Sequence, residues 1–293
     1  MSLQTILKGT GVAIVTPFKS NFDVDLEALG NIIDHVIKGG IDYVVTLGTT
    51  GETPTLSKEE KISIIRFTYE KIAARVPVVV GIGGNDTKEL IKDIETFPLE
   101  KSVAVLSASP YYNKPSQEGI FQHYKMLAEA SPKPILLYNV PGRTGRNINA
   151  STAIRLANEI KNIAGIKEAS GDMAQCIQIL RDKPDDFLVV GGDDALILPQ
   201  IACGMQGVIS VAANAFPKKF SDMIRYCLNQ DFIAGKKLND ELLEAYDLMF
   251  AENNPAGVKA FLTEMGLLNN YLRMPMIPLS EELHSKVKLY LQK

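Results

Sequence analysis

The sequence predicts an α/β fold, a (β/α)8 TIM barrel followed by a C-terminal helical extension. Short runs of β-branched and apolar residues alternate with segments of helical periodicity, and eight such runs occur. No linker or low-complexity tract interrupts them, and 293 residues suit one barrel with a modest extension. Right-handed crossovers between consecutive parallel strands place the helices outside a closed barrel. The alternative is an open doubly wound sheet, which needs a reversal of strand order that the sequence does not reveal.

The eight predicted strands are nearly continuous apolar runs, as expected for strands that are covered on both faces. The barrel core is predicted to span 1–216, and 217–293 to supply the final barrel helix and the C-terminal helical extension. We expect that last part to be helical to its end, broken only at 273–278. In chain order the strands are predicted at 11–18, 43–48, 77–83, 102–109, 133–140, 163–170, 187–193 and 207–214.

A helix after the second strand carries a clear start signal. Ser57 is the predicted N-cap, and Glu60 follows three residues later, which is the spacing of a capping box. Ile62, Ile65 and Phe67 are predicted to form the face of this helix that packs against the barrel.

Charge and composition narrow the classes of function. The chain has 31 basic and 34 acidic residues, a net charge of -3, which argues against a nucleic-acid surface or a polybasic membrane surface. No apolar run is long enough to cross a bilayer. The three cysteines are widely spaced, so a reduced, cytoplasmic setting is predicted. None of the three histidines has ligand spacing, and we expect neither a metal nor an organic cofactor.

Lys167 stands in the sixth predicted strand, where an apolar residue would pack better. Gly165, Lys167 and Ala169 share one face of the strand, and the two small neighbours leave room for a ligand beside the lysine. Burial disfavours the ammonium, and the neutral amine is the form that attacks a carbonyl to give a Schiff base. Lys167 is therefore a candidate nucleophile. The structural alternative is a lysine that pairs with Glu168 or Asp172.

Further reactive side chains follow other predicted strands, at the end of the barrel where active sites lie. Thr50, Tyr112 and Tyr138 could form a proton wire, because a threonine hydroxyl both donates and accepts a hydrogen bond. Arg143 lies in a tight turn, and its guanidinium matches a carboxylate at two points, which suggests an acidic substrate. Each of these residues alone is also compatible with an ordinary packing or surface role.

The chain resembles the dihydrodipicolinate synthase family, which also includes N-acetylneuraminate lyase and related 2-keto acid aldolases. Each shared string is weak alone, but eight in the family's order across the whole length are specific. The resemblance implies a pyruvate-dependent class I aldolase on a TIM barrel. The strings are AIVTPF, GTTGE, PYYNKPSQEG, YNVPGRTG, GIKEASGD, GDD, GVISVAAN and NP.

The resemblance implies which residues bind the first substrate. Lys167 would condense with pyruvate, and Thr49 and Thr50 would hold the pyruvate carboxylate, largely through backbone N–H groups. Gly192 and the carbonyl group of Ile209 would line the pyruvate side of the site.

For the second half of the reaction, the resemblance implies proton transfer by Tyr138 in a relay with Thr50 and Tyr112. The enamine would attack L-aspartate 4-semialdehyde, whose carboxylate meets Arg143. Cyclisation would give 4-hydroxy-tetrahydrodipicolinate, in the first committed step of diaminopimelate and lysine biosynthesis. Tyr112 would enter from a neighbouring subunit, which implies a homodimer and, as a pair of dimers, a homotetramer.

The resemblance also implies a possible allosteric site for lysine. Positive charge beside a cationic effector weakens its binding, so the sequence predicts weak or absent inhibition by lysine. The residues that match the lysine site are Asn85, Glu89 and Tyr111, and the departures from it are Lys58, Lys61 and Pro54.

Two other functions stay open from the sequence. One is a sister pyruvate aldolase that takes a sugar-derived aldehyde, as N-acetylneuraminate lyase does, although Arg143 favours an acidic aldehyde. The other is a non-catalytic barrel that binds a keto acid. The presence of Lys167 argues against that second reading, because a binding protein needs no nucleophile.

Overall fold

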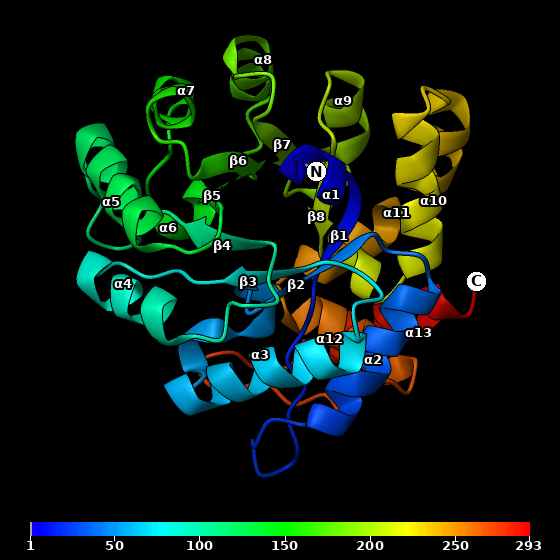
Figure 1. The fold of residues 1–293 in the computed structure, drawn as a ribbon. Coiled ribbons are helices and arrows are strands. Elements are labelled where there is room, and N and C mark those ends of the chain that lie inside the picture. The colour runs from blue at the N-terminus through cyan, green and yellow to red at the C-terminus, as the bar shows by residue number, and fades with distance from the viewer. Residues whose placement is uncertain (1) are drawn as a thin grey trace.

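The computed structural model describes residues 2–293, in which eight parallel strands close into a barrel in the order β1 to β8 (Figure 1). All eight predicted strands are confirmed. All eight end earlier than predicted, because the chain stays buried at the rim after the last hydrogen bond of each ladder. The strands are β1 Gly9–Ala13, β2 Tyr43–Thr46, β3 Val78–Gly81, β4 Ala104–Ala108, β5 Ile135–Asn139, β6 Ile163–Glu168, β7 Leu188–Gly191 and β8 Gly207–Ser210.

The first strand differs most from its prediction. β1 begins two residues earlier than expected and ends at Ala13, so the apolar run 14–18 lies beyond it. The backbone N–H of Val15 donates to Oδ1 of Asn214, 3.2 Å away, and Phe18 forms an isolated bridge with Val24. The chain therefore leaves the sheet here although its residues stay buried.

Strand residues alternate between two apolar cores. Val44 packs outward against the helices, whereas Val45 points into the barrel, and the same alternation holds along the other strands. Both faces are covered, which explains why the strands read as continuous apolar runs. The buried members of the interior cluster are Leu7, Ala13, Tyr43, Val45, Val79, Ala104, Leu106, Leu136, Tyr138, Val140, Leu188, Val190 and Ile209.

Helices surround the strands, and α1 lies over the mouth of the barrel where the strands begin (Figure 1). Single 3-10 turns lie at Thr49–Gly51 (η1), Thr53–Thr55 (η2), Asp194–Leu196 (η3) and Ala212–Asn214 (η4). The helices are α1 Leu3–Ile6, α2 Leu26–Lys38, α3 Lys58–Ile72, α4 Thr87–Thr96, α5 Gln117–Ala130, α6 Pro141–Thr144, α7 Ala150–Glu159, α8 Met173–Asp182, α9 Ile197–Ala202, α10 Pro217–Leu228, α11 Phe232–Phe250, α12 Ala256–Glu264 and α13 Glu281–Leu291.

The capping box of α3 is confirmed, with reciprocal hydrogen bonds between Ser57 and Glu60. The predicted core face of this helix is confirmed, because Ile65 is buried and the half-buried Ile62 and Phe67 pack against the same apolar core. The prediction did not include the other buried residues of the helix, which are Ile64, Thr68, Tyr69 and Ile72.

The C-terminal part is helical, but its breaks differ from the prediction. The chain leaves the helical conformation at 229–231, between α10 and α11, and at 251–255, between α11 and α12. It does so again over 265–280, which is longer than the predicted 273–278. Gly266, Pro275 and Pro278 lie in the longer segment, and proline disfavours a helix. Within residues 2–293, no helix combines the length and the apolar composition that a bilayer span requires. The division at residue 216 stays a prediction.

Candidate active site

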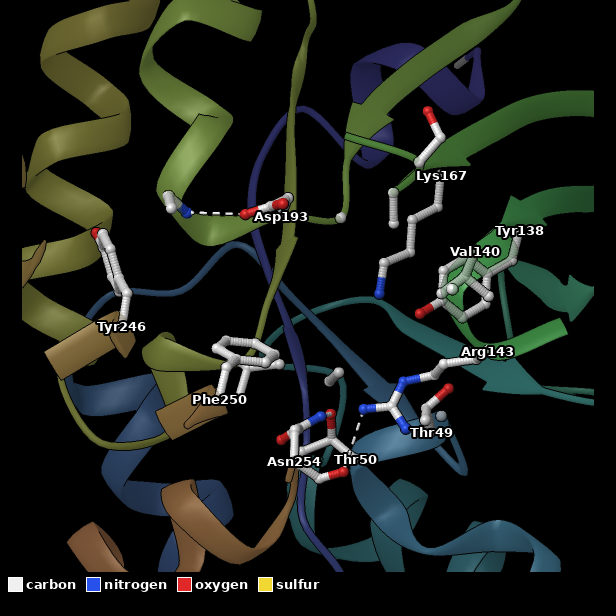
Figure 2. Close-up of a pocket in the computed structure, with 18 of the residues that line it drawn as sticks. Thr49, Thr50, Tyr138, Val140, Arg143, Lys167, Asp193, Tyr246, Phe250 and Asn254 are labelled. Atoms are coloured by element: carbon white, nitrogen blue, oxygen red, sulfur yellow. Dashed lines mark hydrogen bonds between the residues drawn. The ribbon is translucent and has the colours of Figure 1, made fainter. Parts of the chain in front are cut away.

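A cavity of about 740 Å³ opens at the carboxyl ends of the strands, where barrel enzymes place their active sites. Figure 2 shows side chains from several strand ends pointing into it. The C-terminal extension closes one side through residues of α11 and of 251–255. The predicted site residues that line the cavity are Thr49, Thr50, Tyr138, Arg143, Lys167 and Gly192.

Lys167 points into this cavity from β6 and is only 4% exposed. Its Nζ lies 4.4 Å from the ring centroid of Tyr138, because the two residues are partners in the ladder between β5 and β6. Lys167 forms no ion pair with any described acidic residue. Within residues 2–293, Lys167 thus pairs with neither Glu168 nor Asp172, and the structural alternative is wrong.

Glu168 lies on the opposite face of the strand, as the alternation predicts. Its buried carboxylate accepts hydrogen bonds from Nδ2 of Asn139, from Nε2 of Gln175 and from the backbone N–H of Ser170. Asn139 also accepts the backbone N–H of Ile148 at 2.9 Å. This network fixes β5 against β6 directly behind Tyr138 and Lys167.

Gly192 leaves the space that the lysine occupies. A Cβ atom at this position would lie 2.7 Å from Cε of Lys167 and 2.7 Å from Cβ of Ala169. Any other residue would displace the lysine, so glycine is required here by close approach. Ile209 is completely buried in the barrel interior on β8.

The two threonines of the turn after β2 have different surroundings. Thr50 is buried, and its Oγ1 accepts a hydrogen bond from Nδ2 of Asn254 at 3.1 Å. Thr49 lines the main cavity and also a second cavity of about 420 Å³, which Tyr138 and Arg143 line as well. Thr49, rather than Thr50, thus borders both cavities together with Tyr138.

Arg143 lies in the short helix α6 and reaches across the rim to the C-terminal extension. Its Nη2 donates a hydrogen bond to the backbone carbonyl of Asn254 at 3.2 Å, which holds the guanidinium over the cavity (Figure 2). The other donors of a guanidinium fork can still bind a carboxylate.

Tyr112 is the one proposed relay residue that the structure does not bring to the cavity. Its side chain is 89% exposed, and it lines neither of the two cavities. Among residues 2–293, no hydrogen bond joins the hydroxyl groups of Thr50, Tyr138 and Tyr112. The relay is not assembled within one chain.

One residue of the predicted lysine site, Tyr111, borders the second cavity. Nδ2 of Asn85 donates to the carbonyl of Tyr111 at 3.1 Å, whereas Glu89 pairs with Lys92. Tyr111 and Lys61 line the second cavity. Lys58 forms an ion pair with Asp93 at 3.0 Å.

Sequence analysis missed a buried ion pair beneath the Thr49–Thr50 turn. Lys259 and Glu52 are both buried and bind each other. Nζ of Lys259 also donates to the carbonyl of Tyr271 at 2.9 Å, and the backbone N–H of Arg273 donates to Glu52 at 3.0 Å. Burial lowers the pKa of Lys259 to about 8, against the opposing attraction of Glu52.

Sequence analysis also missed Asp194, which stands behind the cavity wall. Its Oδ2 accepts the backbone N–H groups of Val211 at 3.0 Å and Ala212 at 2.7 Å. Complete burial raises the pKa of Asp194 to about 6, because these hydrogen bonds only partly offset the lost hydration. Its neighbour Asp193 lines the cavity and could have signalled a polar rim after β7.

The raised pKa of Asp194 predicts that the free energy of unfolding depends on pH. A carboxyl group with a raised folded-state pKa stabilises the fold below its unfolded pKa, near 4, and this contribution is lost as the pH rises through about 6. The difference in unfolding free energy between the wild type and Asp194→Asn should fall by at most about 3 kcal/mol from pH 4 to pH 7. Urea titrations at both pH values measure it; a constant difference would contradict the raised pKa.

The strands form a closed parallel barrel, and a buried lysine, a tyrosine and an arginine surround a cavity at its rim. This is the architecture of an aldolase-type lyase. The model of the dihydrodipicolinate synthetase family matches residues 6–293. The chain belongs to this family, and it is an enzyme, a lyase.

Individual relatives agree over nearly full length. The 4-hydroxy-tetrahydrodipicolinate synthase of Flavobacterium psychrophilum is 48% identical over 282 residues, which cover 96% of each chain. That of Phocaeicola vulgatus is 49% identical over 276 residues, covering 94% of this chain and 93% of the relative. A solved structure of dihydrodipicolinate synthase from Acinetobacter baumannii, complexed with pyruvate, is 38% identical and covers 98% of each chain with a TM-score of 0.95.

Proposed function

We propose that this enzyme condenses pyruvate with L-aspartate 4-semialdehyde to give 4-hydroxy-tetrahydrodipicolinate. The observation that carries the proposal is the buried side chain of Lys167, which has no acidic partner among the described residues and faces the cavity beside Tyr138 and Arg143. The names of the relatives support the same reaction.

On the pyruvate side, Nζ of Lys167 attacks the keto carbon, and loss of water gives the iminium. The iminium withdraws electrons from the neighbouring methyl group, which loses a proton to form an enamine. The carboxylate of pyruvate is bound at η1, where the first backbone N–H groups of the turn have no intrahelical partners. Thr49 and Thr50 supply these groups.

Proton transfer is the role that we propose for Tyr138, whose ring lies beside Nζ of Lys167. The cavities favour Thr49 over Thr50 as its hydroxyl partner, since Thr49 borders both cavities with the tyrosine. The exposed Tyr112 would complete the relay in the site of a second copy of this chain. A homodimer, and a homotetramer built from two dimers, are the assemblies that follow.

Arg143 selects the second substrate in this proposal. Its guanidinium is anchored at the rim and pairs with the carboxylate of the aldehyde. The enamine carbon attacks the aldehyde carbon, whose oxygen takes up a proton to become a hydroxyl group, and the iminium forms again. The amino group of the second substrate then attacks the iminium carbon, closes the ring and displaces the amine of Lys167. The product enters diaminopimelate and lysine biosynthesis.

Consumption of pyruvate after addition of aspartate 4-semialdehyde tests this function. Rapid consumption with this aldehyde, and little with N-acetylmannosamine, is the expected result. The reverse preference would make the enzyme a sister aldolase for sugar-derived aldehydes, and no consumption with either aldehyde would contradict the proposed reaction.

Lysine should inhibit this enzyme weakly or not at all. Lys61 lines the second cavity next to Tyr111, and its positive charge opposes a cationic effector there. We expect the rate of pyruvate consumption to change little in a titration with lysine up to millimolar concentrations. Strong inhibition well below that range would contradict the prediction, and Lys61→Ala would then show whether this charge matters.

A further inference from the structure

Asn254 joins the active site from outside the barrel. It lies between α11 and α12, lines the main cavity and is only 5% exposed. Its side chain donates to Oγ1 of Thr50, and its backbone carbonyl accepts from Arg143 (Figure 2). One residue of the extension thus contacts the groups proposed for both substrate carboxylates.

The hydrogen bond to Thr50 has a direction. An amide nitrogen only donates, so Oγ1 of Thr50 is the acceptor, and its own proton remains free for another group. Nearby hydroxyl groups are already committed: Thr16 donates to the carbonyl of Gly51 at 2.8 Å, and Thr53 donates to the carbonyl of Gly48 at 2.8 Å. Thr50 makes no donated hydrogen bond within residues 2–293, and it lines the cavity.

Packing alone does not explain why residue 254 is an asparagine. Its Oδ1 is buried without a partner among the described residues, which opposes folding. An apolar side chain of similar size would avoid this cost but could not donate to Thr50. The amide nitrogen is therefore the atom for which asparagine is needed here.

We propose that Asn254 is a positioning residue that holds the hydroxyl group of Thr50 so that its proton is donated to the carboxylate of the keto acid. The inference rests on the proposed function, because it assumes that the keto acid carboxylate binds at the Thr49–Thr50 turn. It assigns a binding role to the C-terminal extension, which the strand-end rule for barrels does not cover.

Substitution of Asn254 separates this role from the anchoring of Arg143, because the arginine is held by the backbone carbonyl. Asn254→Leu should raise the KM for pyruvate about 10- to 100-fold, the range for one hydrogen bond to a charged group. The KM for the aldehyde should change less than about 3-fold. Asn254→Asp keeps the shape but can only accept from Thr50, so it should raise the KM for pyruvate at least as much.

Two controls complete the experiment. Asn253 is the adjacent asparagine and contacts Met276 instead of Thr50, so Asn253→Leu should leave both KM values unchanged. In a Thr50→Val background, Asn254→Leu should raise the KM for pyruvate less than about 2-fold further, since coupled residues are not additive. Circular dichroism checks that each variant is folded.

The outcomes distinguish this inference from the function on which it rests. If borohydride traps pyruvate on the wild type but Asn254→Leu leaves the KM for pyruvate unchanged, the inference is wrong and the function stands. Full additivity with Thr50→Val would also overturn it. If the wild type gives no adduct, the proposed function itself fails.

Discussion

Replacing Lys167 with methionine should lower turnover by about 10⁴-fold or more, because loss of a covalent nucleophile removes the reaction path itself. The barrel should remain folded. Methionine has a similar length, and the small neighbours Ala169 and Gly192 accommodate it. Since Lys167 has no ion pair among the described residues, removal of its charge should leave stability unchanged or raise it by up to about 2 kcal/mol. Rates of pyruvate consumption and urea titrations measure the two effects.

The matched control is Lys167→Arg, which keeps the positive charge but cannot form an imine. We expect it to be as inactive as the methionine variant, because the amine and not the charge is needed. Turnover above about 1% of wild type in either folded variant would show that Lys167 is not the nucleophile.

Replacing Lys259 with methionine should cost about 3–5 kcal/mol in the free energy of unfolding, the usual effect of breaking a buried ion pair. Glu52 would be left buried, with the backbone N–H of Arg273 as the hydrogen-bond donor that remains to it. Methionine would also lose the hydrogen bond to the carbonyl of Tyr271 and the contact of Nζ with the ring of Phe18, 4.4 Å from its centroid. Chemical denaturation measures the loss.

The double variant Lys259→Met with Glu52→Gln distinguishes two causes of the lost stability: the unpaired buried charge of Glu52 and the loss of packing. Neutralising the glutamate removes the unpaired buried charge, so most of the lost stability should return. A double variant as unstable as the single one would mean that Lys259 acts mainly through packing and the hydrogen bond to Tyr271.

The fold could be predicted because its signals are local. Alternation of apolar runs and helical periods identified all eight strands, and the capping box placed the start of α3. The break at 265–280 was predicted too short, because contacts with distant residues decide where that segment runs. One such contact is the backbone hydrogen bond from Arg273 to Glu52, which no pattern in the surrounding sequence indicates.

The candidate site could be predicted only in part. Lys167 stands out in an apolar strand, and the strand-end rule gathers Tyr138 and Arg143 beside it. Asn254 and Lys259 come from the extension, to which that rule does not apply. Arg143, which Asn254 binds, and Glu52, which Lys259 binds, are each more than 100 residues away in the chain. Tyr112 is exposed on the described chain, and its proposed partner is the site of a second copy, which a single sequence cannot place.

Two lysines are buried among residues 2–293, Lys167 and Lys259, and their surroundings differ. Lys259 is neutralised by Glu52 and does not line either cavity described above, whereas Lys167 faces the main cavity without an ion pair among residues 2–293. Of these two lysines, Lys167 is the one whose amine faces the cavity and forms no ion pair. This contrast between the two lysines is the main support for the proposed Schiff-base mechanism.

Reduction with borohydride in the presence of pyruvate, followed by mass spectrometry of the peptides, tests this assignment most directly. The mechanism predicts one pyruvate-derived adduct per chain, on the peptide that contains Lys167, and none when pyruvate is omitted. An adduct on Lys259, or no adduct on a folded and active enzyme, would contradict it.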